Sequence, residues 1–370
     1  MSIHFRKYYR DIAILVIVAG FALSSSYLVI RVGDTGETPT ADEVYAGTNT
    51  GTSSKKATIF AVGDIMLSRG VATAIDRAGS PDYPFTDIGK LLLTSDFNVG
   101  NLEAPVSGND RKVGHDLIFN VRKNDLTGLI RYKFKTLSLA NNHALDQGVD
   151  GLKFTKTFLS EKGLGYFGAG NDQVEAWRPS VISANGVRVA FIGASYASFN
   201  DGGVARNEQL ARVEDVPRLS AAVAEARRTS DFVIVIMHAG EEYTRQPNHT
   251  QITFAKEAID AGADMVIGSH PHWIQPVVQY RGRYIFYSLG NFIFDQQKPD
   301  TKEGLMLRIN LTRPPGPSVT TAVLDEVDLF PVVVEQIGRP RLADPSETTE
   351  ILKKVGISEA VLRPDGSERK

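Results

Sequence analysis

Two histidines separated by one proline follow a short apolar run in the second half of the chain. The run 265–267 is rich in β-branched residues and Gly268 ends it, which predicts a strand. Pro271 disfavours a helical conformation at the residue before it, so we expect extended backbone at His270. In extended backbone, residues two apart point to the same side, so His270 and His272 would face one place. Imidazole is the commonest metal ligand, so this pair predicts a metal site if other residues supply partners.

Four further predicted strands end in residues that can bind a metal or move a proton. Their apolar runs are 58–62, 96–99, 134–140 and 232–237, and the residues that follow are Asp64, Glu103, Asn142 with His143, and His238. Taken singly, Asp64 could cap a helix and Glu103 could be a solvated loop carboxylate. Taken together, residues that follow successive strands converge at one edge of an α/β sheet, where ligands bind. Such a set is sufficient for two metal ions about 3.5–4 Å apart, an arrangement that activates water for hydrolysis.

Helical patterns alternate with these strands. They cover residues 85–94, 149–162, 216–228 and 251–261, and this alternation favours βαβ units around a buried sheet. Two predicted hairpins turn at Asn185-Gly186 and Arg281-Gly282, and runs at 305–311 and 320–329 look like further strands. This antiparallel content argues against a plain Rossmann sheet. We therefore predict an α/β fold in which two mixed β-sheets form a sandwich flanked by helices.

The composition limits the chemistry. The chain of 370 residues has 42% hydrophobic and 23% charged residues, which is ordinary for a globular protein. Its net charge of −2 gives no basic field, so nucleic acid is not an expected partner. Cysteine is absent, which excludes disulfides, thiolate metal sites and cysteine nucleophiles. Imidazole, carboxylate and amide ligands remain, and these favour Mn, Fe or Zn.

The N-terminal segment predicts a membrane anchor. Residues 12–30 carry no charge and would span roughly 28 Å as a helix, close to the thickness of a bilayer core. Basic residues precede this segment and acidic residues follow it, so residues 1–11 would be cytoplasmic and the body extracytoplasmic. A cleaved signal peptide is the alternative, and it would give a secreted protein. We expect residues 31–56 to be a flexible linker, 57–345 the main domain, and 346–370 a C-terminal helix and tail.

Six blocks of sequence resemble the calcineurin-like metallophosphoesterase superfamily and, within it, the CapA branch of poly-γ-glutamate capsule proteins. The blocks are Gly63-Asp64-Ile65-Met66-Leu67 with Arg69, Asn101-Leu102-Glu103, Asn141-Asn142-His143 with Asp146, His238-Ala239-Gly240-Glu241-Glu242-Tyr243, Gly268-Ser269-His270-Pro271-His272, and Ser288-Leu289-Gly290-Asn291-Phe292. Their order and spacing fit that family over residues 58 to 300. The resemblance implies the metallophosphoesterase-like sandwich, here preceded by one transmembrane helix, in a protein that acts at the bacterial cell surface.

The resemblance also implies a role for the residues in these blocks. It implies two divalent metal ions, bridged by Glu103, with the ligand set Asp64, Glu103, Asn142, His238, His270 and His272. His143 would protonate the leaving group, and Asp146 would orient it. The implied substrate-binding residues are Arg69, Asn101, Glu242, Tyr243 and Asn291. Met66 stands where the superfamily has histidine, so His272 would serve the poorer metal, while His270 would join Asn142 and His238 on the other.

Three functions are consistent with this resemblance. The first is a metal-dependent hydrolase that uses metal-bound hydroxide on poly-γ-glutamate or a related anionic polymer, during its synthesis, export or processing. The second is a non-catalytic polymer-binding component of a capsule synthase complex, in contact with membrane synthase subunits. The third is an extracytoplasmic phosphodiesterase. In each of these, residues 12–30 would hold the protein in the lipid bilayer.

Overall fold

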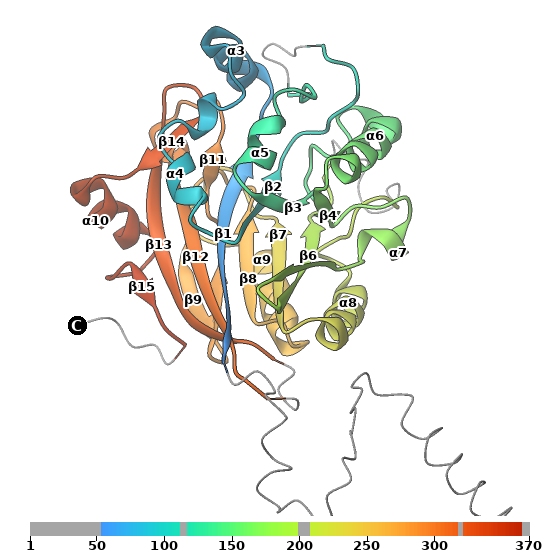
Figure 1. Cartoon of the computed structure of the whole chain (residues 1–370), viewed down its shortest axis with the longest axis vertical. Helices are drawn as coiled ribbons and strands as arrows, with labels where there is room; N and C mark the ends of the chain where they lie inside the picture. The colour runs from blue at the N-terminus through green and yellow to red at the C-terminus, as the bar shows by residue number, and fades with distance from the viewer. Residues whose placement is uncertain (1–52, 112–116, 199–207, 317–320, 365–370) are drawn as a thin grey trace, which may run out of the picture. The chain divides into compact units, whose positions relative to one another are not determined.

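Two β-sheets lie face to face in the part of the chain that the computed structural model describes, which is residues 53–111, 117–198, 208–316 and 321–364 (Figure 1). The predicted membrane segment lies outside these residues, as do the predicted cytoplasmic N-terminus and most of the linker. Among the helices that are described, none combines the length and the apolar character needed to cross a bilayer.

The first sheet holds nine of the described strands, in the order β14-β13-β12-β1-β2-β3-β4, with β11 beside β1 and β15 beside β13. Their bounds are β1 Lys55–Ile65, β2 Phe97–Leu102, β3 Phe134–Ser138, β4 Gly165–Phe167, β11 Asn291–Ile293, β12 Glu303–Arg313, β13 Val323–Glu335, β14 Arg339–Leu342 and β15 Val361–Leu362. Strands β1 to β4 run parallel, whereas β12 is antiparallel to β1 and β13 is antiparallel to β12. The residues that follow β1, β2 and β3 therefore lie at one edge of this sheet.

The second sheet holds six of the described strands, in the order β5-β6-β7-β8-β10-β9. Their bounds are β5 Ser180–Ala184, β6 Val187–Ser195, β7 Phe232–His238, β8 Met265–Ser269, β9 Val277–Tyr280 and β10 Arg283–Phe286. Strands β6, β7, β8 and β10 run parallel, and the two edge strands are antiparallel to their neighbours. Both sheets are thus mixed, as the sequence predicted.

Helices cover the outer surfaces of both sheets (Figure 1). The described helices are α3 Arg69–Ala78, η2 Tyr83–Phe85, α4 Gly89–Leu92, α5 Thr127–Arg131, α6 Gly148–Glu161, α7 Gln173–Ala176, α8 Val216–Thr229, α9 His249–Asp260, η4 Pro299–Lys302 and α10 Pro345–Lys354. Side chains from α3, α4, α5 and α6 join the core on the outer face of the first sheet. Those from α8 and α9 join the core on the outer face of the second sheet.

A third core fills the space between the two sheets. In β12, Leu305, Leu307 and Ile309 belong to this core, whereas Met306 belongs to the core under the outer helices. This alternation follows from the two-residue period of a strand. Burying one such aliphatic side chain stabilises the fold by roughly 1.5–3 kcal/mol, so the strands that carry the site rest on apolar contacts on both faces.

Local signals account for several element boundaries. The predicted hairpin at Asn185-Gly186 is confirmed, since both residues have positive φ (51° and 80°) between β5 and β6. Helix α9 begins at His249 because Asn248 and Gln251 form a capping box. The helix predicted over residues 85–94 was only partly right, because a 3-10 turn and the four-residue α4 occupy that region.

The C-terminal helix packs on the sandwich. Ile351 and Leu352 of α10 and Leu362 of β15 belong to the core between the sheets. Strand β15 also pairs with β13, through Leu362 opposite Val327. Residues 346–364 are therefore part of the same folded body as the sheets.

Candidate metal centre

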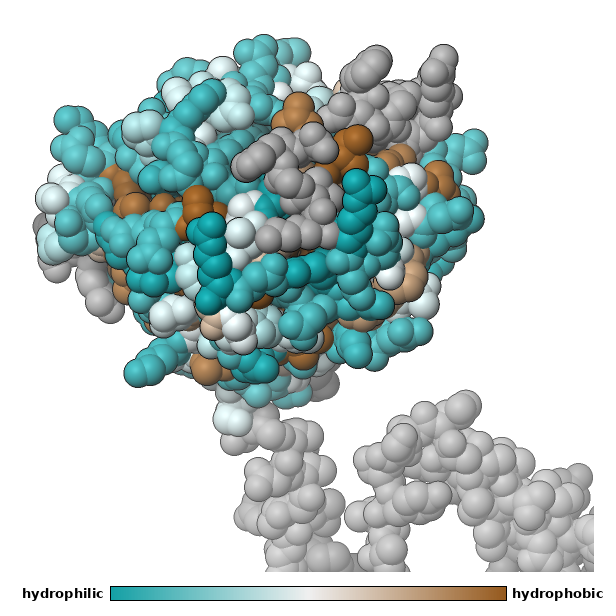
Figure 2. All heavy atoms as spheres, turned by 90° about the horizontal axis from the view of Figure 1, so that it is seen from above, coloured by the Kyte–Doolittle hydropathy of each residue, from teal (hydrophilic) through white to brown (hydrophobic). Residues whose placement is uncertain are grey.

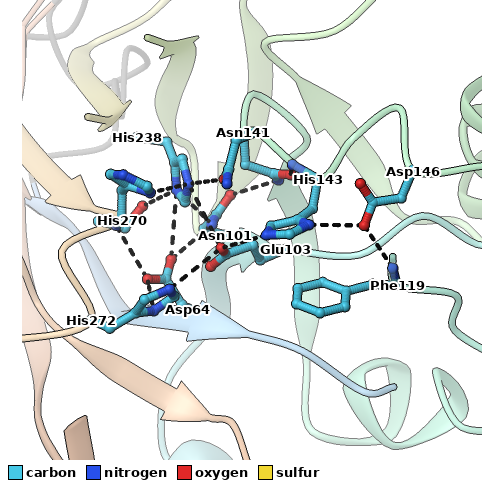
Figure 3. Close-up of polar contacts among 12 residues, drawn as sticks. Asp64, Asn101, Glu103, Phe119, Asn141, His143, Asp146, His238, His270 and His272 are labelled. Atoms are coloured by element: carbon cyan, nitrogen blue, oxygen red, sulfur yellow. Dashed lines mark hydrogen bonds and ion pairs between the residues drawn. The ribbon is translucent and has the colours of Figure 1, made fainter. Parts of the chain in front are cut away.

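Six predicted ligands meet at the edge where the parallel strands end. Figure 3 labels five of them, and the sixth, Asn142, lies with its Oδ1 2.8 Å from Nε2 of His238. Asp64 lies in β1, Glu103 follows β2, Asn142 follows β3, His238 ends β7, and His270 and His272 follow β8. All six side chains are buried. The three residues with oxygen donors belong to the first sheet and the three histidines to the second. The centre therefore lies where the edges of the two sheets meet.

Glu103, His238 and His270 form the first group of possible ligands, since one donor atom of each lies within 4.8 Å of the others. Nε2 of His238 lies 3.8 Å from Oε1 of Glu103 and 3.2 Å from Nδ1 of His270. The same nitrogen lies 2.8 Å from Oδ1 of Asn142. Two imidazoles, a carboxylate and an amide oxygen are thus gathered around one small volume.

Asp64, Glu103 and His272 form the second group. Nδ1 of His272 lies 3.6 Å from Oδ2 of Asp64, and its Nε2 lies 3.9 Å from Oε1 of Glu103. The structure places the buried Met66 after Asp64, so this group has one imidazole where the first group has two. Glu103 belongs to both groups, which is where the resemblance implies a carboxylate shared between ions.

The environment of Glu103 tests whether metal ions fit this site. Both of its carboxylate oxygens are buried, and neither has a hydrogen-bond partner among the described residues. Burial, and then the nearby charge of Asp64, raise the pKa of Glu103 well above its usual value. Leaving a buried acceptor unpaired costs about 1–3 kcal/mol. Imidazole nitrogens of His143, His238 and His272 lie 3.8 to 4.0 Å from its Oε1.

Such spacing suits ligands that each lie about 2.0–2.2 Å from a shared ion. Burial lowers the pKa values of His238 and His270 well below the usual value, and neighbouring histidines lower them further. Burial also lowers the pKa of His272, although the charge of Asp64 opposes this effect. Neutral imidazoles offer the lone pairs that a metal requires. The residues therefore fit divalent metal ions.

His143 and Asp146 form a hydrogen-bonded pair beside the two ligand groups (Figure 3). Nδ1 of His143 lies 2.8 Å from Oδ2 of Asp146, and its Nε2 lies 4.0 Å from Oε1 of Glu103. The backbone N–H of Phe119 donates to the same Asp146 oxygen at 2.6 Å. The Phe119 ring stacks on His143, with centroids 4.0 Å apart. One ring nitrogen thus faces the ligands while a carboxylate holds the other, an arrangement that orients a general acid or base.

Two of the implied substrate-binding residues, Asn101 and Asn291, lie behind the ligands instead. Nδ2 of Asn101 donates to Oδ1 of Asp64 at 2.8 Å, and its Oδ1 accepts from Asn141 at 3.1 Å. Oδ1 of Asn291 lies 2.9 Å from Nδ1 of His272. Each asparagine is only 1% exposed. They hold ligands in place, so the structure does not support direct contact with a substrate.

Arg69, Glu242 and Tyr243 lie closer to the surface. The Arg69 side chain is 12% exposed and pairs with Asp295 at 2.5 Å. Glu242 is exposed and Tyr243 is partly buried. The Tyr243 ring centroid is 6.2 Å from that of His272. These three residues remain accessible beside the centre.

The backbone of the two histidines departs from the extended conformation that Pro271 predicted. The φ angles are 100° at His270 and 57° at His272, so that expectation was wrong. Positive φ costs on the order of 1–3 kcal/mol at such residues and persists only where the surroundings enforce it. Here the N–H of His270 donates to Oδ2 of Asp64 at 3.2 Å, and the carbonyl of Pro271 accepts from Tyr243 at 2.9 Å. Tertiary contacts thus override the local preference, and both imidazoles still reach the centre.

Three residues of the centre were given no role by the sequence. Oγ of Ser269 lies 3.0 Å from Nδ1 of His238, and Asn141 accepts from the backbone N–H of His143 at 3.1 Å. Ser269 and Asn141 each lie next to a predicted ligand in the chain, so the sequence could have marked them as residues of the centre. Phe119 lies far from the motifs in sequence, and no pattern marks it.

Comparisons with known proteins show the family to which this chain is similar. A family model described as bacterial capsule synthesis protein PGA_cap matches residues 58–296. The capsule biosynthesis protein CapA of Bacillus anthracis is 36% identical over 284 residues, which cover 74% of this chain and 67% of that protein. The PGA biosynthesis protein CapA of Bacillus subtilis (strain 168) is 33% identical over 255 residues, covering 68% of this chain and 67% of that protein.

Solved structures give a looser comparison. The NAD nucleotidase of Haemophilus influenzae aligns with a TM-score of 0.44 at 10% identity, over 82% of this chain and 63% of that one. A 5'-nucleotidase precursor from Thermus thermophilus aligns with a TM-score of 0.44 at 14% identity, over 79% of this chain and 55% of that one. These TM-scores are too low to support an argument about activity.

Fold and site together define a two-sheet α/β protein with buried carboxylate, amide and imidazole groups that could hold metal ions at the joined sheet edges. The chain belongs to the bacterial capsule synthesis protein PGA_cap family. The CapA-type resemblance of the six sequence blocks is thereby confirmed.

Proposed function

We propose that this protein is a metal-dependent hydrolase that acts on poly-γ-glutamate, or a related anionic polymer, in capsule synthesis, export or processing. The observation that carries the proposal is Glu103, whose two buried oxygens lack hydrogen-bond partners in the described structure and lie between two ligand groups. Relatives named for capsule and PGA biosynthesis support the polymer as substrate.

Each residue of the centre then has a task. Divalent ions held by the two groups would lower the pKa of a water and polarise a substrate oxygen. His143 would deliver a proton from Nε2 to the leaving group, since Asp146 holds Nδ1 at 2.8 Å and Phe119 packs against the ring. Asn101 and Asn291 would keep Asp64 and His272 in place during the reaction.

The location of the protein is part of the same proposal. Residues 12–30 would anchor the chain in the cell membrane, with the two-sheet domain on the extracytoplasmic side. Recovery of the intact chain from membranes, and its digestion by protease added outside spheroplasts, would support this. A chain lacking residues 1–30 in the culture medium would support cleavage and secretion instead.

One observation favours a second candidate, a non-catalytic polymer-binding component of a capsule synthase. The second ligand group has one imidazole, and Met66 stands two residues after Asp64, where the resemblance to the superfamily implies a histidine. A weakly loaded second position would impair hydrolysis and leave polymer binding intact. A phosphodiesterase would use the same centre on a different substrate.

Metal analysis and substrate screening of the full chain test these alternatives. The purified protein is loaded with Mn, Fe or Zn without oxygen, and bound ions and hydrolysis of poly-γ-glutamate and chromogenic phosphodiesters are measured. His272→Ala should lose metal and activity, whereas His249→Ala, at an exposed position on α9, should retain both. Absence of bound ions after every loading would refute the hydrolase. Cleavage of phosphodiesters without cleavage of the polymer would favour the third function.

A further inference from the structure

Residues 291–298, which we name the β11 wall, pack along the His272 side of the centre. Asn291 at its start holds His272, and the Phe294 ring lies 4.8 Å from the same imidazole. Nε2 of Gln296 donates to the hydroxyl of Tyr243 at 3.3 Å. Successive residues of this wall therefore touch both a metal-ligand candidate and side chains nearer the surface.

Asp295 of the β11 wall orients Arg69. Its Oδ1 accepts from Nη2 of Arg69 at 2.5 Å, and its Oδ2 accepts from the backbone N–H of Gly70 at 3.0 Å. The guanidinium carbon lies 4.6 Å from the Phe119 ring centroid and 5.8 Å from that of Phe294. Within the described residues, the buried Nε of Arg69 has no hydrogen-bond partner.

The backbone of Arg69 adds to this fixed placement, because its φ is 46° at the first residue of α3. Such strain persists only where neighbouring groups enforce it. The two aromatic rings beside the guanidinium each pack on a histidine of the centre, since Phe119 stacks on His143 and Phe294 contacts His272. The guanidinium is held in place and the Arg69 side chain remains 12% exposed beside the ligand groups, so it is suited to bind a carboxylate or phosphate oxygen.

Lys298, at the end of the β11 wall, supplies a second cation. Its Nζ lies 3.8 Å from the Tyr243 ring centroid, and the side chain is exposed. Burial and the charge of Glu242 raise the pKa of Tyr243 to about 12, and the positive charge of Arg69 acts in the opposite direction. Asp295, which pairs with Arg69, and Gln296, which donates to the Tyr243 hydroxyl, are adjacent in the chain, so Tyr243 and the neighbouring Lys298 lie on the same side of the centre as Arg69.

We propose that Arg69 and Lys298 form an anion-binding rim that contacts carboxylates on neighbouring units of a hydrophilic polyanion. This inference rests on the proposed function, whose polymer substrate it deepens by assigning the residues that recognise its charge. The end of the molecule that carries α3, seen in Figure 2, is mainly hydrophilic with hydrophobic residues in scattered patches. A charged, water-soluble chain is the ligand that such a face and two cations would accept.

Glu242 allows a test in which a substitution should strengthen polymer binding, whereas loss of a cation should weaken it. It is exposed and lies next to Tyr243 in the chain, where its charge acts on the Tyr243 hydroxyl. A negative charge beside the rim repels a polyanion, so Glu242→Gln should strengthen binding of the polymer. A site that recognises an amine or a neutral sugar would show the reverse or no effect.

The experiment measures binding of fluorescein-labelled poly-γ-glutamate to the full chain by fluorescence anisotropy. Lys298→Gln should weaken binding roughly threefold, the effect of losing one exposed ionic contact. Arg69→Lys keeps the charge but loses the planar fork, and it should weaken binding roughly tenfold. Lys256→Gln is the matched control, because Lys256 also lies over a tyrosine ring, 5.4 Å from the Tyr280 centroid, on the remote helix α9. Poly-γ-glutamate with esterified carboxylates should bind weakly to every variant.

The rim is overturned if Lys298→Gln binds the labelled polymer as tightly as the wild type does. Lys298 is exposed, so its replacement should leave folding intact, which circular dichroism checks for all variants. Failure of the wild type to bind poly-γ-glutamate also overturns the rim. If that protein nevertheless binds metal, a hydrolase that acts on another substrate remains supported. If the protein binds no metal after any loading but binds the labelled polymer in a way that depends on Lys298, the rim is supported and only the hydrolase is refuted.

Discussion

Glu103→Gln should have opposite effects on the stability of the metal-free and metal-loaded protein. In the metal-free state, the substitution removes a buried carboxylate whose oxygens have no hydrogen-bond partners in the described structure. Relief of such an unsatisfied group is worth about 1–3 kcal/mol, so the variant should be more stable than the wild type in the presence of a chelator. Nδ1 of His143 and of His272 each face an oxygen, so their Nε2 atoms, 4.0 and 3.9 Å from Oε1 of Glu103, can accept a hydrogen bond from the new amide.

Bound metal should reverse the order of stability of Glu103→Gln and the wild type. A ligand at about 100 times its Kd stabilises the folded state by about 2.7 kcal/mol, and the wild type should gain that amount for each ion bound. A neutral amide cannot replace a carboxylate shared by two ligand groups, so Glu103→Gln should gain little. The wild type then becomes the more stable of the two proteins.

Urea unfolding of the full chain, with and without metal, measures these differences. Fluorescence of Trp177 and Trp273, the two tryptophans of the chain, reports the transition. Glu161→Gln, at an exposed position on α6, is the control and should match the wild type under both conditions. The reasoning fails if Glu103→Gln is less stable than the wild type in chelator, or if metal stabilises both proteins equally.

Three further changes test other parts of the structure. Gly268→Ala should lower the free energy of unfolding in urea by about 1–3 kcal/mol, because the new Cβ would lie 2.0 Å from the backbone oxygen of Tyr287. An unchanged free energy of unfolding would mean that the backbone shifts freely. Asp231 is buried, and although burial raises its pKa, hydrogen bonds and charge from Arg188 outweigh burial and lower it. Its stabilisation is therefore present above the unfolded pKa of about 3.9 and lost as pH falls through the lower folded pKa, so Asp231→Asn should cost most at pH 7 and little near pH 2; a cost that does not change with pH would contradict this. Asp146→Asn should leave bound metal unchanged but lower kcat by about 10²-fold or more, since the imidazole that it orients loses its carboxylate partner, and unchanged kcat would remove that imidazole from catalysis.

The sequence predicted the strand ends well because each is marked locally. Short β-branched runs such as 232–237 stop at a polar residue, and a strand that stops there places that residue at the sheet edge. Helix α3 was missed although Ser68 and Gly79 at its ends are typical capping residues. In the structure the Ser68 hydroxyl accepts from the backbone N–H of Asn120 instead of capping the helix, and Arg69 begins the helix with a positive φ. Tertiary contacts set both of these features.

Residues that support the ligands were harder to predict than the ligands themselves. Phe119 packs on His143, and Asp295, although only three residues after the sixth block, pairs with the distant Arg69, and no pattern in the sequence marks either contact. Asn101 and Asn291 lie in the predicted region and contact Asp64 and His272, and sequence alone cannot distinguish an amide that faces a substrate from one that faces a ligand.

The division of the donors between the two sheets has a consequence for how the centre is assembled. Residues 64 to 142 supply only oxygen donors and residues 238 to 272 supply only nitrogen donors, so neither stretch alone offers the mixed set found in the finished protein. The first ligand group is complete only when the chain has been made through His270, and the second only through His272, and both require the two sheets to have met. An ion would therefore be acquired late, from the compartment in which the completed domain folds, and it would add to the hydrogen bonds that already join the two sheet edges, between His238 and Asn142 and between His270 and Asp64.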